Sequence, residues 1–243
     1  MKIAICISGI ARGQVKHNIG RMKEAFGDKA DIFTASWKGH KNDLTEQYNA
    51  KYYDEPAIHY NPWKDCVTDN PHPKYKAYKQ SFIDKTEISQ HPKLLNATKQ
   101  LIAHAYHLPD IPEEYDMIIR VRWDTVVSIK LDFTKYLEQS YNENIAVGFA
   151  IRGGRHAKLD EFKNIDHVYV TEDTDQMWSR DWCYWLNDNM IFHPRKLYDC
   201  NKVLQYHEEK KLWPAEYGWY QMLSNTDNHH SVYGGAVIEK FWR

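Results

Sequence analysis

A chain of 243 residues, 42% of them hydrophobic, is long enough for one α/β domain with a full core. Its 32 basic and 33 acidic side chains give a formal net charge of −1, which argues against a protein that covers nucleic acid with a basic surface. The four cysteines lack the spacing of zinc or redox motifs, and the apolar N-terminal run is too short for a signal peptide or a membrane span. We therefore expect a cytoplasmic protein with reduced thiols and no transmembrane helix.

Residues 2–37 have the pattern of a βαβ unit. The apolar run 2–7 stops at Ser8-Gly9, which predicts a strand buried in a parallel sheet. Apolar residues at near-helical spacing predict a helix over 14–26, and the run 31–37 predicts a second strand. A right-handed crossover should place the two strands in one sheet.

The segment 38–90 is polar, rich in tyrosine and interrupted by four prolines. One strand is predicted inside it, over 57–60, and we interpret the rest as a functional loop. We expect this loop to act as a lid that orders when ligand binds. Its aromatic rings are suited to stacking on a sugar or a base: Tyr52, Tyr53, Tyr60 and Trp63.

The second half of the chain contains further predicted elements. Pro92 near the first helical position and a stripe of apolar residues predict a helix over 92–107. Weaker patterns predict strands over 144–149, 167–170 and 232–238 and a helix over 198–211. The sequence shows no repeat, low-complexity tract or obvious linker, so we expect a single domain.

The strand predicted within 115–124 carries the most informative side chains. Alternation places Arg120, Arg122 and Asp124 on one face, although the preceding residues 117–119 are apolar, as in a strand between two helix layers. Two interpretations stay open. Asp124 could form an ion pair that closes the end of the sheet, or the guanidinium groups could bind phosphate while Asp124 holds a divalent cation. The second fits the rule that ligands of open α/β sheets bind outside the carboxyl ends of the strands.

Three segments together resemble small glycosyltransferases of the GT-A fold. They are Ile-Ser-Gly-Ile-Ala-Arg-Gly over 7–13, Asp-Ile-Phe-Thr-Ala-Ser-Trp over 31–37, and Tyr-Asp-Met-Ile-Ile-Arg-Val-Arg-Trp-Asp over 115–124. The similarity is to bacterial enzymes of polysaccharide and lipopolysaccharide synthesis and their viral relatives, mainly over 1–37 and 92–128, with a looser match over 186–222. It implies one GT-A-like α/β domain over 1–243, with a mixed, mostly parallel sheet flanked by helices and a Rossmann-like N-terminal half. The nucleotide would bind within about 1–128, and the acceptor would face about 129–243 together with the loop 38–90.

The resemblance also implies a set of donor-binding residues: Ser8, Gly9, Arg12, Gly13, Arg120, Arg122 and Asp124. Asp124 would be the remaining acid of the family's Asp-x-Asp motif, which holds Mn²⁺ or Mg²⁺ against the donor diphosphate. Arg122 stands where the first aspartate would be, and a guanidinium can itself neutralise a diphosphate, so the need for a cation stays open. His229 is the candidate second metal ligand, although adjacent histidines in a polar turn are often simply exposed.

Two carboxylates are candidates for the base that deprotonates the acceptor. Glu216 lies among aromatic residues, and an apolar setting raises a carboxyl pKa and improves it as a base. Glu216 could equally begin a helix after Pro214. Asp188 precedes an apolar run, and the resemblance implies a contact with the donor sugar or the acceptor there; a turn or cap role is the alternative.

The expected acceptor is a hydroxyl of a glycan or polysaccharide, contacted by the rings of the loop 38–90. Arg152 and Arg155, in the basic loop 151–158, are expected to contribute as well. One alternative acceptor is hydroxymethylated cytosine in DNA, as for the glucosyl- or arabinosyltransferases of large phages. Another alternative is a non-catalytic nucleotide- or carbohydrate-binding protein on the same fold. The chain would act on a nucleotide sugar in the cytoplasm of a bacterium or a phage-infected cell.

Overall fold

The computed structural model describes residues 1–60, 92–150, 175–179, 186, 188–213, 215–223, 228–233 and 236–238. Its strands are β1 (Ile3–Ser8), β2 (Ala30–Trp37), β3 (Lys51–Tyr53), β4 (Met117–Arg122), β5 (Thr125–Val127), β6 (Val147–Ala150), β7 (Asp175–Ser179), β8 (Met190–Pro194), β9 (Asn228–Tyr233) and β10 (Ala236–Ile238). The α-helices are α1 (Val15–Phe26), α2 (Asp43–Gln47), α5 (Pro92–His107), α6 (Thr134–Glu143), α8 (Cys200–Glu208) and α9 (Ala215–Leu223). Short 3₁₀ turns cover Gly27–Lys29, Lys38–His40, Leu108–Asp110 and Arg195–Leu197.

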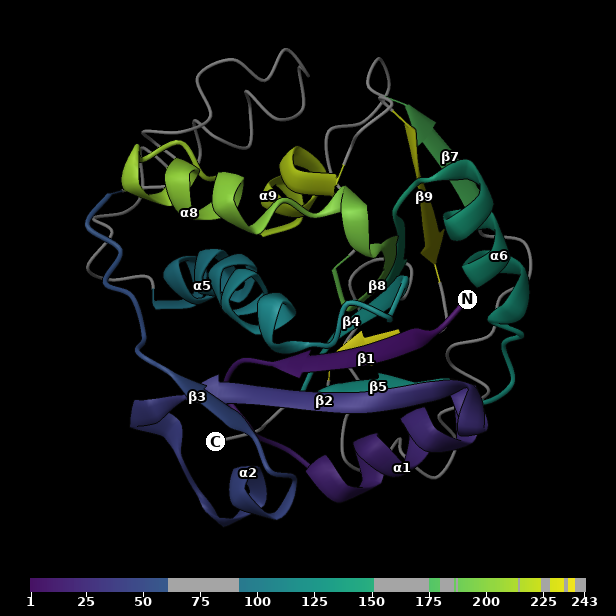
Figure 1. The fold of residues 1–243 in the computed structure, drawn as a ribbon, viewed down its shortest axis with the longest axis horizontal. Helices are drawn as coiled ribbons and strands as arrows, with labels where there is room; N and C mark the ends of the chain where they lie inside the picture. Colours follow the sequence, from purple (N-terminus) through teal and green to yellow (C-terminus); the bar gives the residue numbers. More distant parts are fainter. Residues whose placement is uncertain are drawn as a thin grey trace.

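Eight strands form one mixed sheet in the order β3-β2-β1-β4-β8-β6-β9-β7, and β5 pairs with β10 in a separate ribbon (Figure 1). The first four strands are parallel to one another, as in a Rossmann-like half. β8 then runs antiparallel to both β4 and β6, while β6 and β9 are parallel and β7 is antiparallel. The predicted α/β class, with a mixed, mostly parallel sheet and a Rossmann-like N-terminal half, is confirmed.

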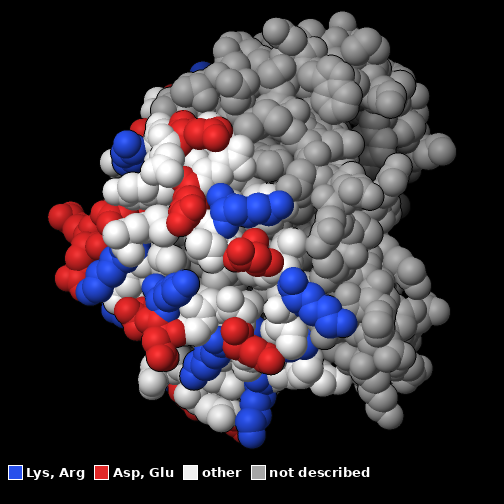
Figure 2. Space-filling view, turned by 90° about the vertical axis from the view of Figure 1, so that its right-hand side faces the viewer, with Lys and Arg blue, Asp and Glu red and all other residues white. Residues whose placement is uncertain are grey.

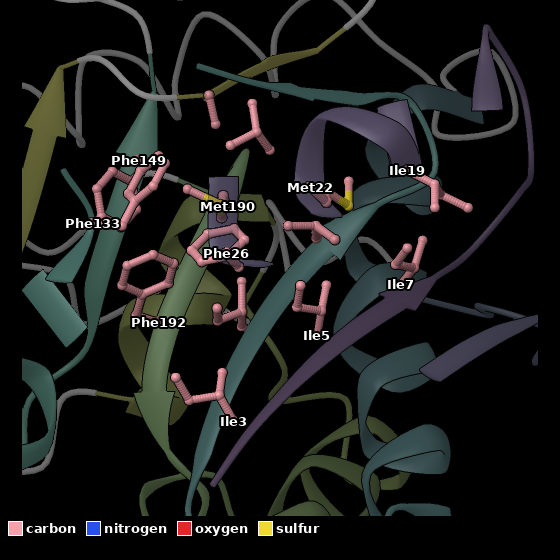
Figure 3. Packing of buried hydrophobic residues seen from close by; sticks show 14 of the residues in the cluster. Ile3, Ile5, Ile7, Ile19, Met22, Phe26, Phe133, Phe149, Met190 and Phe192 are labelled. Atoms are coloured by element: carbon pink, nitrogen blue, oxygen red, sulfur yellow. The ribbon is translucent and has the colours of Figure 1, made fainter. Parts of the chain in front are cut away.

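The two faces of the sheet are buried by different sets of side chains. In β1 the isoleucines at 3, 5 and 7 enter one apolar cluster, whereas Ala4 and Cys6 enter the other. α1 and α6 contribute to the isoleucine side, where phenylalanine rings from α1, β6, β8 and the residue before α6 gather beside Met190, and Met22 lies near Ile19 (Figure 3). On the other face α5 lies over the sheet, and α8 and α9 pack against α5 (Figure 1). Both faces of β1 and β4 are therefore shielded from water, which explains their near-continuous apolar sequence.

Most of the predicted elements agree with the structure to within a few residues. The helix predicted over 92–107 is α5 with the same bounds, and those predicted over 14–26 and 198–211 are α1 and α8. α8 is the shorter because the Asp199 side chain caps its start by accepting from the Lys202 amide at 3.0 Å. None of the helices in the described part of the chain is long and apolar enough to cross a bilayer.

The prediction of a strand over 57–60 is wrong, because those residues adopt no regular structure. The strand in this region is β3, which adds three residues in parallel to the end of β2. Pro56 follows soon after β3, and proline cannot donate to a ladder, so the strand does not extend into 57–60. The strand predicted over 167–170 lies outside the described residues.

Candidate functional site

The topology places a candidate site at the carboxyl ends of β1 and β4. From β1 the chain builds the sheet in one direction through β2 and β3, whereas β4 lies on the other side of β1. Such a switch point is where open α/β sheets bind ligands. A small pocket, open to solvent, lies there, and we call it the switch-point pocket. It is lined by Ser8, Gly9, Ile10, Arg12, Trp37, Asn96, Lys99, Gln100 and Arg122.

The loop after β1 forms one wall of this pocket. Gly9 and Gly13 have φ angles of +105° and +85°, a backbone region that side chains with a Cβ rarely occupy. Ser8 is only 2% exposed, and its Oγ has no hydrogen-bond partner within the described part of the chain. A buried hydroxyl is normally satisfied. Ser8 lines the pocket, but its Oγ has almost no exposed surface, so a ligand would reach this hydroxyl only after a small shift of the wall.

Arg12, Arg122 and Asp124 form a compact charged group beside the pocket. Arg122 donates through Nε and Nη2 to the two oxygens of Asp124, both at 2.8 Å, and Arg12 Nε donates to Oδ2 at 2.6 Å. Burial alone would raise the pKa of Asp124, but the charges and hydrogen bonds of Arg122 and Arg12 outweigh it and hold that pKa below its usual value. The ion pair that the sequence left as an alternative is therefore formed.

The described residues do not fit a divalent cation held by Asp124. Both of its oxygens already accept from guanidinium groups, and no group of three potential ligands occurs among the described histidine, cysteine, aspartate and glutamate side chains. The expected partner His229 lies on β9, three strands from β4. The strand registers place His229 in the same row across the sheet as Ile118, which lies near the start of β4. Since neighbouring strands are about 4.8 Å apart, the fold separates His229 from Asp124 instead of joining them.

Arg120 occupies a different environment from Arg122, although both point toward α5. It is 0% exposed and does not open onto the pocket. The sequence instead predicts that Arg120 contacts the ligand alongside Arg122. Its guanidinium donates to the side-chain oxygen of Gln100 and to the backbone carbonyl of Asp188, the latter at 2.6 Å. It also lies over the Trp219 ring, 4.4 Å from its centroid. Arg120 thus lies behind the pocket wall that Gln100 forms.

Asp188, a candidate base, is brought to the same edge of the sheet. β8 is antiparallel to β4, so the residues just before β8 lie near the carboxyl end of β4. Asp188 is half-buried there, and the neighbouring Asn189 carbonyl accepts from Thr125 Oγ1 at 3.0 Å. The side chain of Glu216, the other candidate, lies outside the described residues. Its position in the first turn of α9 is one turn before Trp219.

The rings expected to stack on an acceptor are packed within the protein. Tyr52 and Tyr53 are half-buried in β3, and their hydroxyls donate to Thr45 Oγ1, at 2.9 Å, and to Asp110. Tyr60 is 6% exposed and contacts His207 Nδ1 at 3.2 Å through its hydroxyl. The described part of the predicted lid, 38–60, thus contains regular structure, and its three tyrosine hydroxyls contact other side chains of the protein. Trp63, Arg152 and Arg155 lie outside the described residues, and an acceptor role for all six residues stays a prediction.

The α5 wall of the pocket was missed by the sequence analysis. Asn96, Lys99 and Gln100 line the pocket from the first half of the helix, and Lys99 pairs with Glu55 at 2.8 Å. Spacings of three and four residues put these positions on one side of a helix. The apolar side of this helix predicts packing against the sheet. Polar residues on the other side are usual for any solvent-facing helix, so they do not indicate a binding site.

A larger hollow opens at the opposite, amino edge of the sheet. Leu108, Tyr115, Asp116, Pro194, Arg195 and Lys196 are among its lining residues. The Arg195 guanidinium is committed there to three backbone carbonyls, at 2.8 to 3.0 Å. The hollow is larger but lacks the switch-point position and the buried free hydroxyl, so we place the candidate site at the smaller pocket.

No protein-family model matches the chain, and no curated protein matches its sequence. Its structure is similar to 4-diphosphocytidyl-2C-methyl-D-erythritol synthase from Anaerococcus prevotii, with 13% identity, a TM-score of 0.40, and coverage of 85% of this chain and 83% of that one. It is also similar to residues 1–349 of S. aureus TarS in complex with UDP-GlcNAc, with 9% identity, a TM-score of 0.47, and coverage of 100% and 60%. The chain thus spans less than two thirds of that TarS segment.

Proposed function

We propose that this chain is a GT-A glycosyltransferase that binds a nucleotide sugar in the switch-point pocket and transfers the sugar to a hydroxyl of a glycan or polysaccharide. One observation carries the proposal. A buried serine hydroxyl with no partner among the described residues lies beside exposed and half-buried cations at the switch point of the sheet. A diphosphate offers the acceptor oxygens and the negative charge that these groups would bind.

The donor diphosphate would lie between the loop after β1 and the start of α5. Arg12 is 47% exposed, so it can turn from Asp124 toward a phosphate while Arg122 keeps its two bonds to that carboxylate. α5 runs from this pocket to the opposite edge of the sheet, where Leu108 follows its last turn. The amino end of α5 therefore lies at the edge of the sheet that carries the pocket, and Asn96, Lys99 and Gln100 line the pocket from one to two turns inside the helix.

The reaction would be a single displacement at the anomeric carbon. Asp188 or Glu216 would accept the proton of the acceptor hydroxyl, and the freed oxygen would bond to the anomeric carbon. The bond between that carbon and the diphosphate oxygen would break, leaving its electron pair on the diphosphate. Arg12 and Arg122 would stabilise the charge that develops on this leaving group. No step needs a cation at Asp124.

DNA is the weaker acceptor candidate. The face of the molecule shown in Figure 2 carries basic and acidic side chains side by side over its described residues, without a region of one sign. Proteins that track a DNA backbone present clustered lysine and arginine. DNA containing hydroxymethylcytosine therefore enters the test as a second acceptor and not as a second function.

The test is an assay of nucleotide release from UDP-, GDP-, dTDP- and CMP-sugars, with oligosaccharides or hydroxymethylated DNA as acceptor. We expect release that depends on one acceptor class. Arg12→Ala should weaken donor binding and slow release, whereas Lys2→Ala should change neither. Lys2 is a suitable control because it is an exposed cation in an ion pair at the opposite edge of the sheet. Nucleotide binding without release for any acceptor would indicate a binding protein, and absence of nucleotide binding would refute the proposal.

A further inference from the structure

Arg120 carries a fully buried positive charge without a carboxylate partner. Its contacts are the side-chain oxygen of Gln100, the backbone carbonyl of Asp188 and the ring of Trp219, and all three groups are neutral. Within the described part of the chain, no carboxylate oxygen lies within 4 Å of its guanidinium, and its Nε has no hydrogen-bond partner. Charged side chains are seldom fully buried unless they are paired.

The surroundings leave this charge largely uncompensated. Asp188 and Asp124 attract it, but Asp124 already binds two guanidinium groups, and Arg122 repels it. His104 and His193, packed nearby, are neutral. The Nδ1–H of His193 donates to the Pro194 carbonyl at 2.9 Å, so its Nε2 must accept from His104 Nε2, 3.1 Å away. Burial lowers the pKa of Arg120 to about 10, so the cation persists at neutral pH.

Arg120 is separated from the switch-point pocket by one layer of side chains. Gln100 lines the pocket and accepts from Arg120 on its inner side. Arg122, two residues further along β4, also lines the pocket, opposite Ser8 of β1. A charge one layer of side chains beneath the pocket is screened less than an exposed charge would be.

We propose that Arg120 is a positioning residue for an anionic ligand, because its buried and unpaired charge attracts the diphosphate of a nucleotide to the switch-point pocket. Its two hydrogen bonds and its stacking also join three elements around that pocket: α5, the segment before β8, and α9. The inference rests on the proposed function. It adds that the fold keeps a costly buried cation whose natural counter-ion is the ligand.

The decisive variant is Arg120→Met, which keeps an unbranched side chain and removes the charge. Arg120→Met removes the desolvation cost of an unpaired buried charge, but it also leaves the Gln100 oxygen and the Asp188 carbonyl without this donor. These two effects oppose each other, so we expect a Tm close to that of the wild type, with binding of UDP and of inorganic pyrophosphate weakened on the order of tenfold or more. Isothermal titration calorimetry at low salt measures the affinity, and a thermal melt measures the Tm. A residue that is merely structural would lower the Tm and leave the affinity unchanged.

A second variant keeps Arg120 and gives it a counter-ion. Gln100→Glu places a carboxylate where the amide oxygen now accepts, so the Tm should rise while UDP affinity falls. Asn96→Asp is the matched control, because it adds the same charge to the same pocket wall, one turn earlier in α5. The loss in Gln100→Glu should exceed that in Asn96→Asp by about threefold or more if Arg120 is being neutralised.

The outcomes separate the two proposals. Wild-type protein that binds neither UDP, pyrophosphate nor any nucleotide sugar would contradict the proposed function. Wild-type binding with equal affinity in Arg120→Met would overturn the role of Arg120 alone. If Arg120→Met does not fold, the comparison of Gln100→Glu with Asn96→Asp decides, and equal losses in those two variants would overturn the role.

Discussion

Replacing Asp124 by asparagine tests whether this carboxylate anchors the carboxyl edge of the sheet. The change keeps the size of the side chain and removes its charge. Asp124 is 2% exposed and accepts three hydrogen bonds, two from Arg122 and one from Arg12. Arg122 is only 16% exposed, so solvent can replace little of the charge of Asp124, whereas Arg12 could turn outward.

Breaking a buried pair by removing one partner costs about 3–5 kcal/mol. Because the asparagine oxygen can still accept one bond and Arg12 is half-exposed, we expect the lower end, about 3 kcal/mol of unfolding free energy. For a chain of 243 residues this corresponds to a Tm lower by roughly 6–12 °C. Arg12→Ala should cost about 1 kcal/mol or less, because its half of the interaction is screened by solvent.

The pH dependence of the effect follows from the direction of the pKa shift. The pKa of Asp124 is lower in the folded protein than in the unfolded chain, where it is about 3.9. Its stabilising contribution is therefore fully present above about pH 4 and is lost as the pH falls through the folded pKa. The difference in stability between wild type and Asp124→Asn should be constant near neutral pH and shrink only below about pH 4.

Urea denaturation followed by tryptophan fluorescence, with thermal melts followed by circular dichroism, measures these differences. Asp54→Asn is the matched control, since that carboxylate is 85% exposed in its pair with Lys38 and should contribute nothing measurable. A Tm for Asp124→Asn within about 2 °C of the wild type at pH 7 would refute the reasoning. It would show that the two guanidinium groups do not depend on Asp124 for their placement.

Three further predictions concern the interior and the pocket. Burial lowers the pKa of His104, His107 and His193, so as the pH falls these side chains are protonated in the unfolded chain before they are protonated in the folded protein. Each of the three histidines should therefore reduce the free energy of unfolding by about 1.4 kcal/mol per pH unit as the pH falls below about 6.5. Denaturation curves that coincide at pH 7 and 5 would contradict this for His104, His107 and His193. Gly218→Ala should lower stability by about 1–3 kcal/mol, because its Cβ would overlap the Trp213 carbonyl oxygen, whereas Gly20→Ala, with nothing within 4 Å of its Cβ, should gain up to about 1 kcal/mol in thermal melts. EDTA should leave the UDP affinity unchanged, because Asp124 is committed to guanidinium groups; a large loss reversed by Mn²⁺ would point to a cation site built from other residues.

Sequence periodicity located the elements of the N-terminal half but not the depth of each charged group. Arg120 and Arg122 were correctly assigned to one face of a strand. Alternation fixes the face and not the distance from the sheet edge, so it could not show that Arg120 is enclosed while Arg122 reaches the pocket. Asp124 accepts hydrogen bonds from Arg122, 2 residues away in the sequence, and from Arg12, 112 residues away. Only the tertiary fold brings Arg12 next to Asp124.

The tyrosine-rich segment shows the opposite difficulty. Prolines and tyrosines at 52, 53 and 60 indicated a loop, yet β3 forms because three residues extend the parallel ladder beside β2. A three-residue edge strand is too short for a period of two to be recognised. The α5 wall was missed for a related reason, since polar residues on a helix are read as solvent-facing until the neighbouring strands are placed.

The pairing of β1 with β4 has a consequence for synthesis of the chain. Ile3 on β1 is opposite Met117 on β4, 114 positions later, whereas β2 follows β1 directly after α1. At about 5–20 residues per second, a ribosome would add those residues in roughly 6–23 seconds. During that interval one edge of the apolar β1 strand has no partner, and such edges pair readily with other chains. Slow or interrupted translation between β1 and β4 should therefore increase aggregation of nascent chains, and a chaperone that covers the first forty residues should reduce it.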